Sequence, residues 1–192
     1  MIRFGSDSLK ARPSSRFTAL ELPLRLLGAS VTLTWSLACG TEPNPARDLT
    51  APFQTSALQY VFTDDGYQWN LSVPVSYTNN RSLPVRLDYC DTSVQRRTGS
   101  NWSTVYTLPC PLSNVLGTDS IPPNGTVEFT YAVHSPHDPN TAPRLPEPLA
   151  GIYRVIFGLR ERQNPNPGLI VWQAIPAIED RRSNEFAASL PH

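Results

Sequence analysis

The residues of this 192-residue chain that could do chemistry are three cysteines, three histidines and a few carboxylates. His134, His137 and Asp138 form an HxxHD pattern at the start of a proline-rich stretch. Imidazole and carboxylate groups bind zinc, but a zinc site needs three or four ligands that are held rigidly. We therefore interpret the cluster as loop residues that meet by chance, with zinc binding as the alternative. We predict no metal site and no cofactor.

Sequence signatures of catalysis are missing. The chain has no GxSxG elbow, HExxH helix, Walker loop or dinucleotide-binding fingerprint. Asp64 and Asp65 precede Gly66, which is typical of a solvated turn rather than of a calcium loop. Acid and base roles cannot be given to any two carboxylates, because those roles depend on separation in space and on burial. We predict that the protein is not an enzyme.

The charge distribution argues against nucleic acid as a partner. The whole chain carries 16 basic and 16 acidic residues, but from Cys39 onward eleven arginines stand against fourteen acids, a net charge of 11 − 14 = −3. Nucleic-acid binding depends on a basic patch that contacts phosphates. We predict no nucleic-acid partner.

The first 38 residues are typical of a secretory signal. Five cations within the first 25 residues precede the apolar run Leu26–Ala38, and small residues precede Cys39. The run is shorter than the roughly 20 apolar residues that span a bilayer. Ser36–Gly40 resembles the lipobox of bacterial lipoproteins, although that pattern prefers leucine at the position of Ser36.

The lipobox resemblance implies that Cys39 is lipidated and becomes the mature N-terminus, which would place the protein in the cell envelope, anchored to the membrane. Plain secretion after a cut near Ala38 and a retained N-terminal helix are the alternatives. Residues 39–55 are polar and rich in proline, and we expect them to form a flexible tether.

The cysteine count is odd, which in an exported protein calls for a free thiol or an intermolecular bridge. All three cysteines are accounted for if Cys39 carries lipid and Cys90 forms a disulfide with Cys110. That disulfide would enclose a loop of 19 residues. A metal site is the alternative, but two cysteines so far apart lack the paired CxxC spacing of zinc ligands. We predict a Cys90–Cys110 disulfide.

Period-two alternation of apolar and polar residues recurs from residue 56 onward, which indicates strands with one buried face. Turn residues such as Pro122–Gly125 separate the runs. We expect about seven strands, over 58–63, 69–77, 85–90, 102–108, 127–134, 151–160 and 169–175. Many short strands of this kind favour a sandwich or a barrel.

The PPNGT turn at 122–126 and the run GIYRVIFGL at 151–159 resemble immunoglobulin-like domains of bacterial surface lipoproteins, over roughly residues 56–176. The resemblance implies one antiparallel immunoglobulin-like β-sandwich, which we assign to 56–178, followed by a C-terminal tail at 179–192. It also suggests Tyr153 as a tyrosine corner. The Cys90–Cys110 spacing departs from antibody domains, so architecture alone carries over.

Trp102 is the candidate recognition residue, because it lies among glycine, serine and asparagine in a loop region. A core position is the equal alternative for Trp102, and we expect Trp69 and Trp172 in the core. We predict a non-enzymatic, envelope-anchored binding or structural module for a protein, peptide or glycan ligand. A secreted protease inhibitor, with loop 91–101 or 135–150 as bait, is the alternative, followed by a glycan hydrolase.

Overall fold

The computed structural model describes residues 45, 47–108, 110, 120–163 and 168–191, all within the compact unit Thr41–His192. The expected signal segment and Cys39 lie outside the described residues. The described chain is all-β and contains one 3-10 turn, η1, at Ile178–Asp180. None of its helical residues makes a segment long and apolar enough to cross a membrane.

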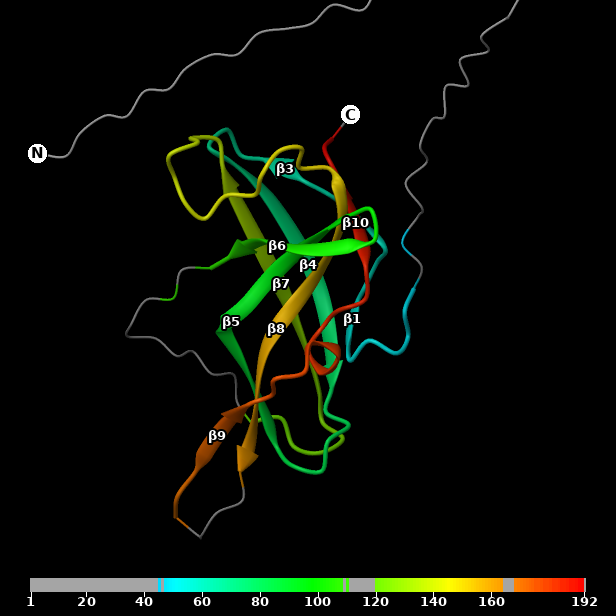
Figure 1. Cartoon of the computed structure of the whole chain (residues 1–192), viewed down its shortest axis with the longest axis vertical. Coiled ribbons are helices and arrows are strands. Elements are labelled where there is room, and N and C mark those ends of the chain that lie inside the picture. Colours follow the sequence, from blue (N-terminus) through cyan, green and yellow to red (C-terminus); the bar gives the residue numbers. More distant parts are fainter. Residues whose placement is uncertain (1–44, 46, 109, 111–119, 164–167, 192) are drawn as a thin grey trace, which may run out of the picture. The chain divides into compact units, whose positions relative to one another are not determined.

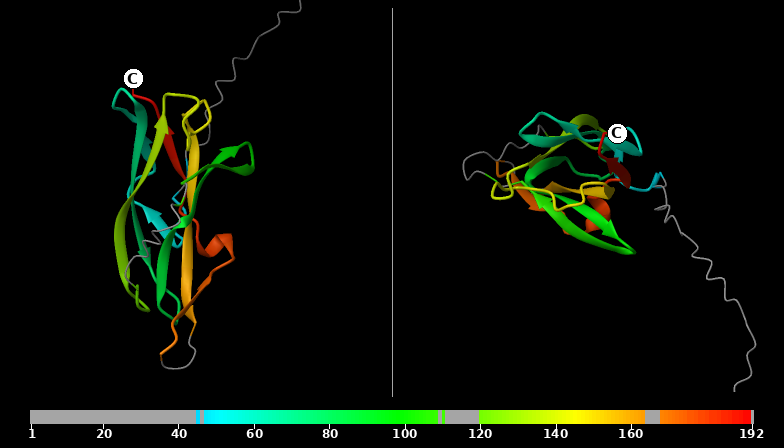
Figure 2. Two further views of the ribbon diagram at one scale, coloured as in Figure 1. Left: turned by 90° about the vertical axis from the view of Figure 1, so that its left-hand side faces the viewer. Right: turned by 90° about the horizontal axis from the view of Figure 1, so that it is seen from above.

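The strands of the described chain form two sheets that lie one behind the other (Figures 1 and 2). Sheet A contains β1 (Phe53–Thr55), β3 (Thr63–Asp64), β4 (Gln68–Thr78) and β7 (Thr126–Pro136). Sheet B contains β2 (Gln59–Val61), β5 (Val85–Thr98), β6 (Asn101–Thr107), β8 (Gly151–Gln163), β9 (Val171–Ala174) and β10 (Phe186–Ser189). The predicted all-β, mainly antiparallel class is therefore confirmed.

Each sheet is organised around one long strand. In sheet A, β4 pairs with β7 along one edge and with β1 and β3 along the other. In sheet B the order is β2-β10-β8-β5-β6, and β9 pairs with the C-terminal part of β8. All pairs are antiparallel except β2 with β10, which run parallel. Consecutive long strands such as β4 and β5, or β7 and β8, therefore belong to opposite sheets.

The core forms where the alternating apolar sets of the two sheets meet. β4 and β8 contribute four residues each, Leu71, Val73, Val75 and Tyr77 from one and Tyr153, Val155, Phe157 and Leu159 from the other. Phe53 stacks between Tyr77 and Phe157, with ring centroids 4.4 and 4.3 Å away. Full burial of one such side chain contributes about 1.5–3 kcal/mol, so β1 is part of the folded domain despite its three residues.

Both ends of the domain differ from the sequence expectation. Phe53–Thr55, which we placed in the tether, forms β1, and Phe186–Ser189, which we placed in the tail, forms β10 against β8. Phe53 and Phe186 are fully buried. Strands of three or four residues are too short to show a periodicity in the sequence. The two strands are held in the domain by the burial of the Phe53 and Phe186 rings.

Pro74 lies within β4, where its missing N–H requires a free edge or a bulge. β1 pairs with β4 only as far as Val75, so the ladder on that edge ends before Pro74, and its carbonyl accepts a hydrogen bond from the Ser56 N–H at 3.0 Å. The edge of β4 that faces β1 is therefore free of strand pairing at Pro74.

Candidate functional site

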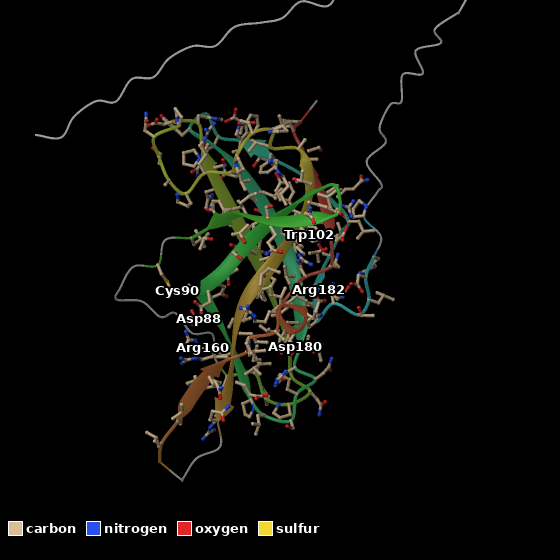
Figure 3. All side chains as sticks on the ribbon, in the orientation of Figure 1. Asp88, Cys90, Trp102, Arg160, Asp180 and Arg182 are labelled. Carbon is tan, nitrogen blue, oxygen red and sulfur yellow. A yellow bond between two sulfur atoms is a disulfide. The ribbon has the colours of Figure 1, made fainter. Side chains whose placement is uncertain are left out.

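The outer face of sheet B gathers charged and aromatic side chains. In β8 the inward set alternates with Arg154, Ile156, Gly158 and Arg160, which the alternation of the strand directs away from sheet A. Sheet B lies in front of sheet A in Figure 1, and Figure 3 labels residues of this face from β5, β6, β8 and the segment between β9 and β10. We call this set the arginine face: Arg86, Asp88, Asp91, Gln95, Arg97, Trp102, Arg154, Arg160, Trp172, Arg182 and Glu185.

Trp102 is positioned by a tight hairpin between β5 and β6. Thr98 pairs with Asn101, and Gly99 has φ +61°, the left-handed conformation that two-residue hairpin turns favour at this place. The turn aligns Trp102 with Arg97 across the pair. The indole is half-buried and is absent from the core cluster, so Trp102 does not take the core position that was one of its two expectations.

Trp102 is stacked against a cation. The Arg154 guanidinium carbon lies 4.4 Å from the indole centroid, and Arg154 Nε donates a hydrogen bond to Gln95 Oε1 at 2.9 Å. Burial lowers the pKa of Arg154 from its usual high value. On the same face, Arg97 forms an ion pair with Glu185 at 2.6 Å. Arg154 forms no ion pair within the described residues, so its charge is available to a ligand.

A bulge in β5 builds the second part of the arginine face. Asp88 pairs with Gly158 and Ser93 with Ile156, so four residues of β5 (89–92) stand opposite one residue of β8. Thr92 Oγ1 closes the bulge by donating to the Asp88 carbonyl at 3.1 Å and accepting from the Gly158 N–H at 3.0 Å. A Cβ on residue 158 would lie 2.0 Å from the Asp88 carbonyl oxygen. Glycine is therefore required there.

The bulge places two carboxylates on one guanidinium. Arg160 Nε lies 2.5 Å from Asp88 Oδ2, and its terminal nitrogen lies 3.2 Å from Asp91 Oδ2. The Asp88 side chain is 4% exposed and also accepts a hydrogen bond from the Cys90 N–H at 3.1 Å. The Asp88 carboxylate is buried and paired with Arg160, and with Asp91 the cluster carries a net formal charge of 1 − 2 = −1.

The predicted Cys90–Cys110 disulfide is confirmed, with the two Cα atoms 5.2 Å apart. Our expectation that Cys90 lies near a strand end is wrong, because β5 continues to Thr98 and Cys90 lies in the bulge. The disulfide therefore joins the chain after β6 to the bulge in β5.

Residues 91–98 belong to β5, so most of the expected bait loop at 91–101 is strand. Only Gly99 and Ser100 form a turn.

A third ion cluster joins the segment before β1 to the segment before β10. Arg182 pairs with Asp48 at 2.6 Å and also with Glu179. The Thr50 hydroxyl and the Arg182 guanidinium, in that order, hydrogen-bond the Asp48 carboxylate and lower its pKa to about 2. Asp180 pairs with Arg81 at 3.3 Å. These ion pairs join chain segments that are far apart in sequence. We therefore interpret them as contacts that stabilise the fold.

The histidines do not converge on a site. His134 Nδ1 lies 2.7 Å from Asn70 Oδ1, and His137 Nε2 lies 2.8 Å from Asp64 Oδ1. Asp65 accepts the N–H groups of Tyr67 and Gln68, as expected for a turn. Among the described residues no three histidine, cysteine or carboxylate side chains gather as metal ligands.

The other two tryptophans in the described part of the chain, Trp69 and Trp172, differ in their surroundings. Trp69 packs against the core cluster, as predicted. Trp172 does not belong to it: the residue lies on β9 with the Arg86 guanidinium carbon 4.8 Å from its ring centroid. The core prediction for Trp172 is wrong, because β9 pairs with the end of β8 at Arg160–Gln163, where the ring stands on the outer face.

Comparison with protein-family models, curated proteins and solved structures finds no match to this chain.

Proposed function

We propose that this protein is an exported, envelope-anchored binding module of immunoglobulin-like architecture that uses the Trp102 end of the arginine face to recognise its ligand. The observation that carries the proposal is a half-buried tryptophan that is held by a hairpin and stacked on Arg154. Tryptophan and arginine are the residue types most enriched at binding hot spots. Both are fixed here on strands, which reduces the ordering entropy lost on binding.

Two features support the immunoglobulin-like assignment. The chain crosses between the sheets from β4 to β5, from β6 to β7 and from β7 to β8, and the strand orders β1-β4-β7 and β2-β10-β8-β5-β6 are similar to those of a seven-to-nine-strand sandwich of that kind. The buried Tyr153 hydroxyl, near the start of β8, donates to the Leu149 carbonyl at 2.5 Å, as a tyrosine corner does. The Cys90–Cys110 bridge differs from the inter-sheet bridge of antibody domains, because it is anchored within β5 of sheet B.

The ligand chemistry follows from the surroundings of Trp102. Arg154 presents a guanidinium group, and Gln95 presents an amide beside the indole, while Arg97 on the same face is paired with Glu185. Guanidinium groups bind carboxylates in a planar, two-point manner, and indole supplies apolar contact. A protein, peptide or glycan that carries carboxylate groups fits this surface best.

The envelope location rests on the sequence before residue 40, and its test is separate from the test of binding. Cells that express the chain are fed radiolabelled palmitate, and the protein is recovered and counted. We expect label on the wild type and none on the Cys39→Ser variant. Equal label on both chains, or none on either, would reject lipidation of Cys39.

Binding is tested by capture from envelope extract on immobilised Cys39→Ser chain, with and without Trp102→Ala. Tyr67→Ala is the matched control, because Tyr67 is an exposed aromatic residue in the β3–β4 turn. We expect a specific band that Trp102→Ala reduces at least tenfold, the usual size of a hot-spot effect of about 2 kcal/mol, and that Tyr67→Ala leaves unchanged.

Protease inhibition is the second candidate, and the loop between β7 and β8 is the observation that favours it. Leu145 and Leu149 anchor this loop in the core, and Arg96 donates to the carbonyls of Pro146 and Pro148 at 2.9 and 2.6 Å. Between these anchors the chain is exposed but fixed, as an inhibitor loop must be. Inhibition of a serine or cysteine protease at micromolar concentration, weakened by Arg96→Ala, would support this candidate; a panel without inhibition rejects it.

A further inference from the structure

Strand β6 lies at an edge of sheet B and lacks the usual protection of an edge. It pairs with β5 along one side, and no strand of the described chain pairs with its other side. Natural edge strands are kept short, charged or interrupted by proline, because free backbone N–H and C=O groups pair readily with other chains. β6 has seven residues, NWSTVYT, with no charge and no proline. Its hairpin with β5 stands out from the two sheets (Figure 2).

The other edges of the described sheets differ from β6. β1, β2, β3 and β9 have only two to four residues each and offer little to a partner. β7 is long, but Glu128 places a charge on it. Its edge is also partly engaged, because the His134 N–H donates to the Tyr106 hydroxyl at 3.3 Å. β6 is therefore the edge most open to an added strand in the part of the chain that the structure describes.

The register of the hairpin determines which backbone groups of β6 face outward. In a two-residue hairpin the residues that flank the turn, here Thr98 and Asn101, exchange both hydrogen bonds, and non-hydrogen-bonded pairs then alternate with hydrogen-bonded ones. Trp102 and Thr104 belong to non-hydrogen-bonded pairs, so their N–H and C=O groups point away from β5. Among the described residues, no hydrogen bond reaches these four groups from the open side. The bulge at Val105 ends the regular edge.

We propose that an extended peptide segment of the partner adds to this edge as a further, antiparallel strand of sheet B. The inference rests on recognition through Trp102, and it narrows the ligand from a protein, peptide or glycan to a peptide main chain in extended conformation. Hydrogen bonds to the backbone of Trp102 and Thr104 supply affinity. The partner residue opposite Trp102 lies about 5 Å away between Cβ atoms, so an apolar or aromatic side chain there packs on the indole.

The size of the edge selects a peptide over a second copy of the chain. The four residues from Asn101 to Thr104 extend about 13 Å, whereas a stable dimer buries about 800 Å² on each partner. The turn and the bulge limit the ladder at its two ends, and the hairpin stands out from the sheets, so two folded domains that met there would gain few further contacts. An extended peptide needs no second surface, because its main chain and alternate side chains contact the strand directly.

The test presents the immobilised Cys39→Ser chain with a phage-displayed library of linear peptides of about ten residues, long enough to cover the edge. Selected peptides are synthesised, and their Kd is measured for the parent, Thr104→Pro and Thr130→Pro. Thr104→Pro removes an outward N–H of β6 and leaves the β5 ladder, so we expect at least tenfold weaker binding. Thr130→Pro is the matched control on β7, because Thr130 lies four residues from His134 and directs its N–H to the same open side. It should bind as the parent does.

A methylation scan of the peptide gives a second measurement that does not depend on the folding of Thr104→Pro. Each backbone nitrogen of the peptide is methylated in turn. We expect at least tenfold loss at alternate amides only, because every second N–H of an added strand faces β6. Failure to select any peptide, equal Kd values for the parent and a folded Thr104→Pro, or a scan without alternation would overturn the proposal. So would a concentration-dependent dimer that Thr104→Pro abolishes, because the edge would then pair with a second copy.

Capture from envelope extract separates this inference from the recognition site on which it rests. A partner that Trp102→Ala and Thr104→Pro both reduce at least tenfold agrees with strand addition at that site. A partner that Trp102→Ala reduces and Thr104→Pro leaves unchanged, such as a glycan held by side chains alone, retains the recognition site and rejects strand addition. A partner that neither variant reduces rejects both.

Discussion

Replacement of Gly158 by alanine tests whether the β5 bulge is built as described. The added methyl group would lie 2.0 Å from the Asp88 carbonyl oxygen and 2.8 Å from the Asp91 Cβ, and the first of these is backbone that cannot rotate away. Moving the bulge would strain the Gly158–Thr92 hydrogen bond and the Asp88–Arg160 pair. Overpacking costs about 1–3 kcal/mol and a lost buried hydrogen bond about 1 kcal/mol, so we expect destabilisation of about 3 kcal/mol.

Thermal unfolding followed by circular dichroism measures this effect. For a domain of this size each kcal/mol lowers Tm by about 2–4 °C, so the variant should melt about 6–12 °C below the wild type. Gly151→Ala is the matched control in the same strand, because its Cβ would lie 3.3 Å from the flexible Arg96 side chain and 3.6 Å, an ordinary contact distance, from the Tyr153 ring. Equal melting temperatures for the two variants would refute the close approach of β5 to Gly158.

Three further changes probe the remaining contacts. Tyr153→Phe removes the donor to the buried Leu149 carbonyl and should destabilise the domain by about 1–3 kcal/mol in urea denaturation; an unchanged midpoint would contradict the corner. Cys90→Ser/Cys110→Ser should cost about 3 kcal/mol, and the unreduced wild type should show neither thiol to a thiol reagent; two reactive thiols would contradict the bridge. Asp48 has a lowered pKa of about 2, so its contribution to stability is present above its unfolded pKa of about 3.8 and is lost as the pH falls toward 2. Stability should therefore fall less steeply between pH 4 and pH 2 in Asp48→Asn than in the wild type, and equal slopes would contradict this linkage.

Strand β4 could be predicted because its burial alternates from Leu71 to Tyr77. Leu71, Val73, Val75 and Tyr77 are separated by polar residues or by proline, and the structure buries every one of them. The strands at the two ends could not be predicted in this way, since β1 and β10 have three and four residues. Their identity depends on rings that are buried by residues distant in sequence, a tertiary effect that local periodicity does not contain.

The second half of β5 was missed for a different reason. The bulge inserts residues 89–92 without partners in the ladder, which interrupts the alternation after Leu87 and makes the following strand read as a loop. One signal was available: Gly158 interrupts an apolar strand, and an isolated glycine in a strand indicates a bulge or a close backbone approach.

The surface position of Trp102 was one of two equal expectations, and Trp172 was assigned to the core in error. Sequence composition around Trp102 is polar, but the decisive facts are the hairpin register and the facing Arg154, which belongs to a strand 50 residues later. Trp172 follows the apolar residues 169–171, which made it resemble a core strand. In the structure β9 pairs with the end of β8, and residues 169–171 are exposed.

The most direct test of recognition by the arginine face is capture from envelope extract by three immobilised chains: the parent, Trp102→Ala and Tyr67→Ala. Circular dichroism of each chain first establishes that all three are folded. We predict one partner that the parent and Tyr67→Ala retain equally and that Trp102→Ala retains at least tenfold less. Equal capture by all three chains, or no partner for any of them, would contradict recognition through Trp102.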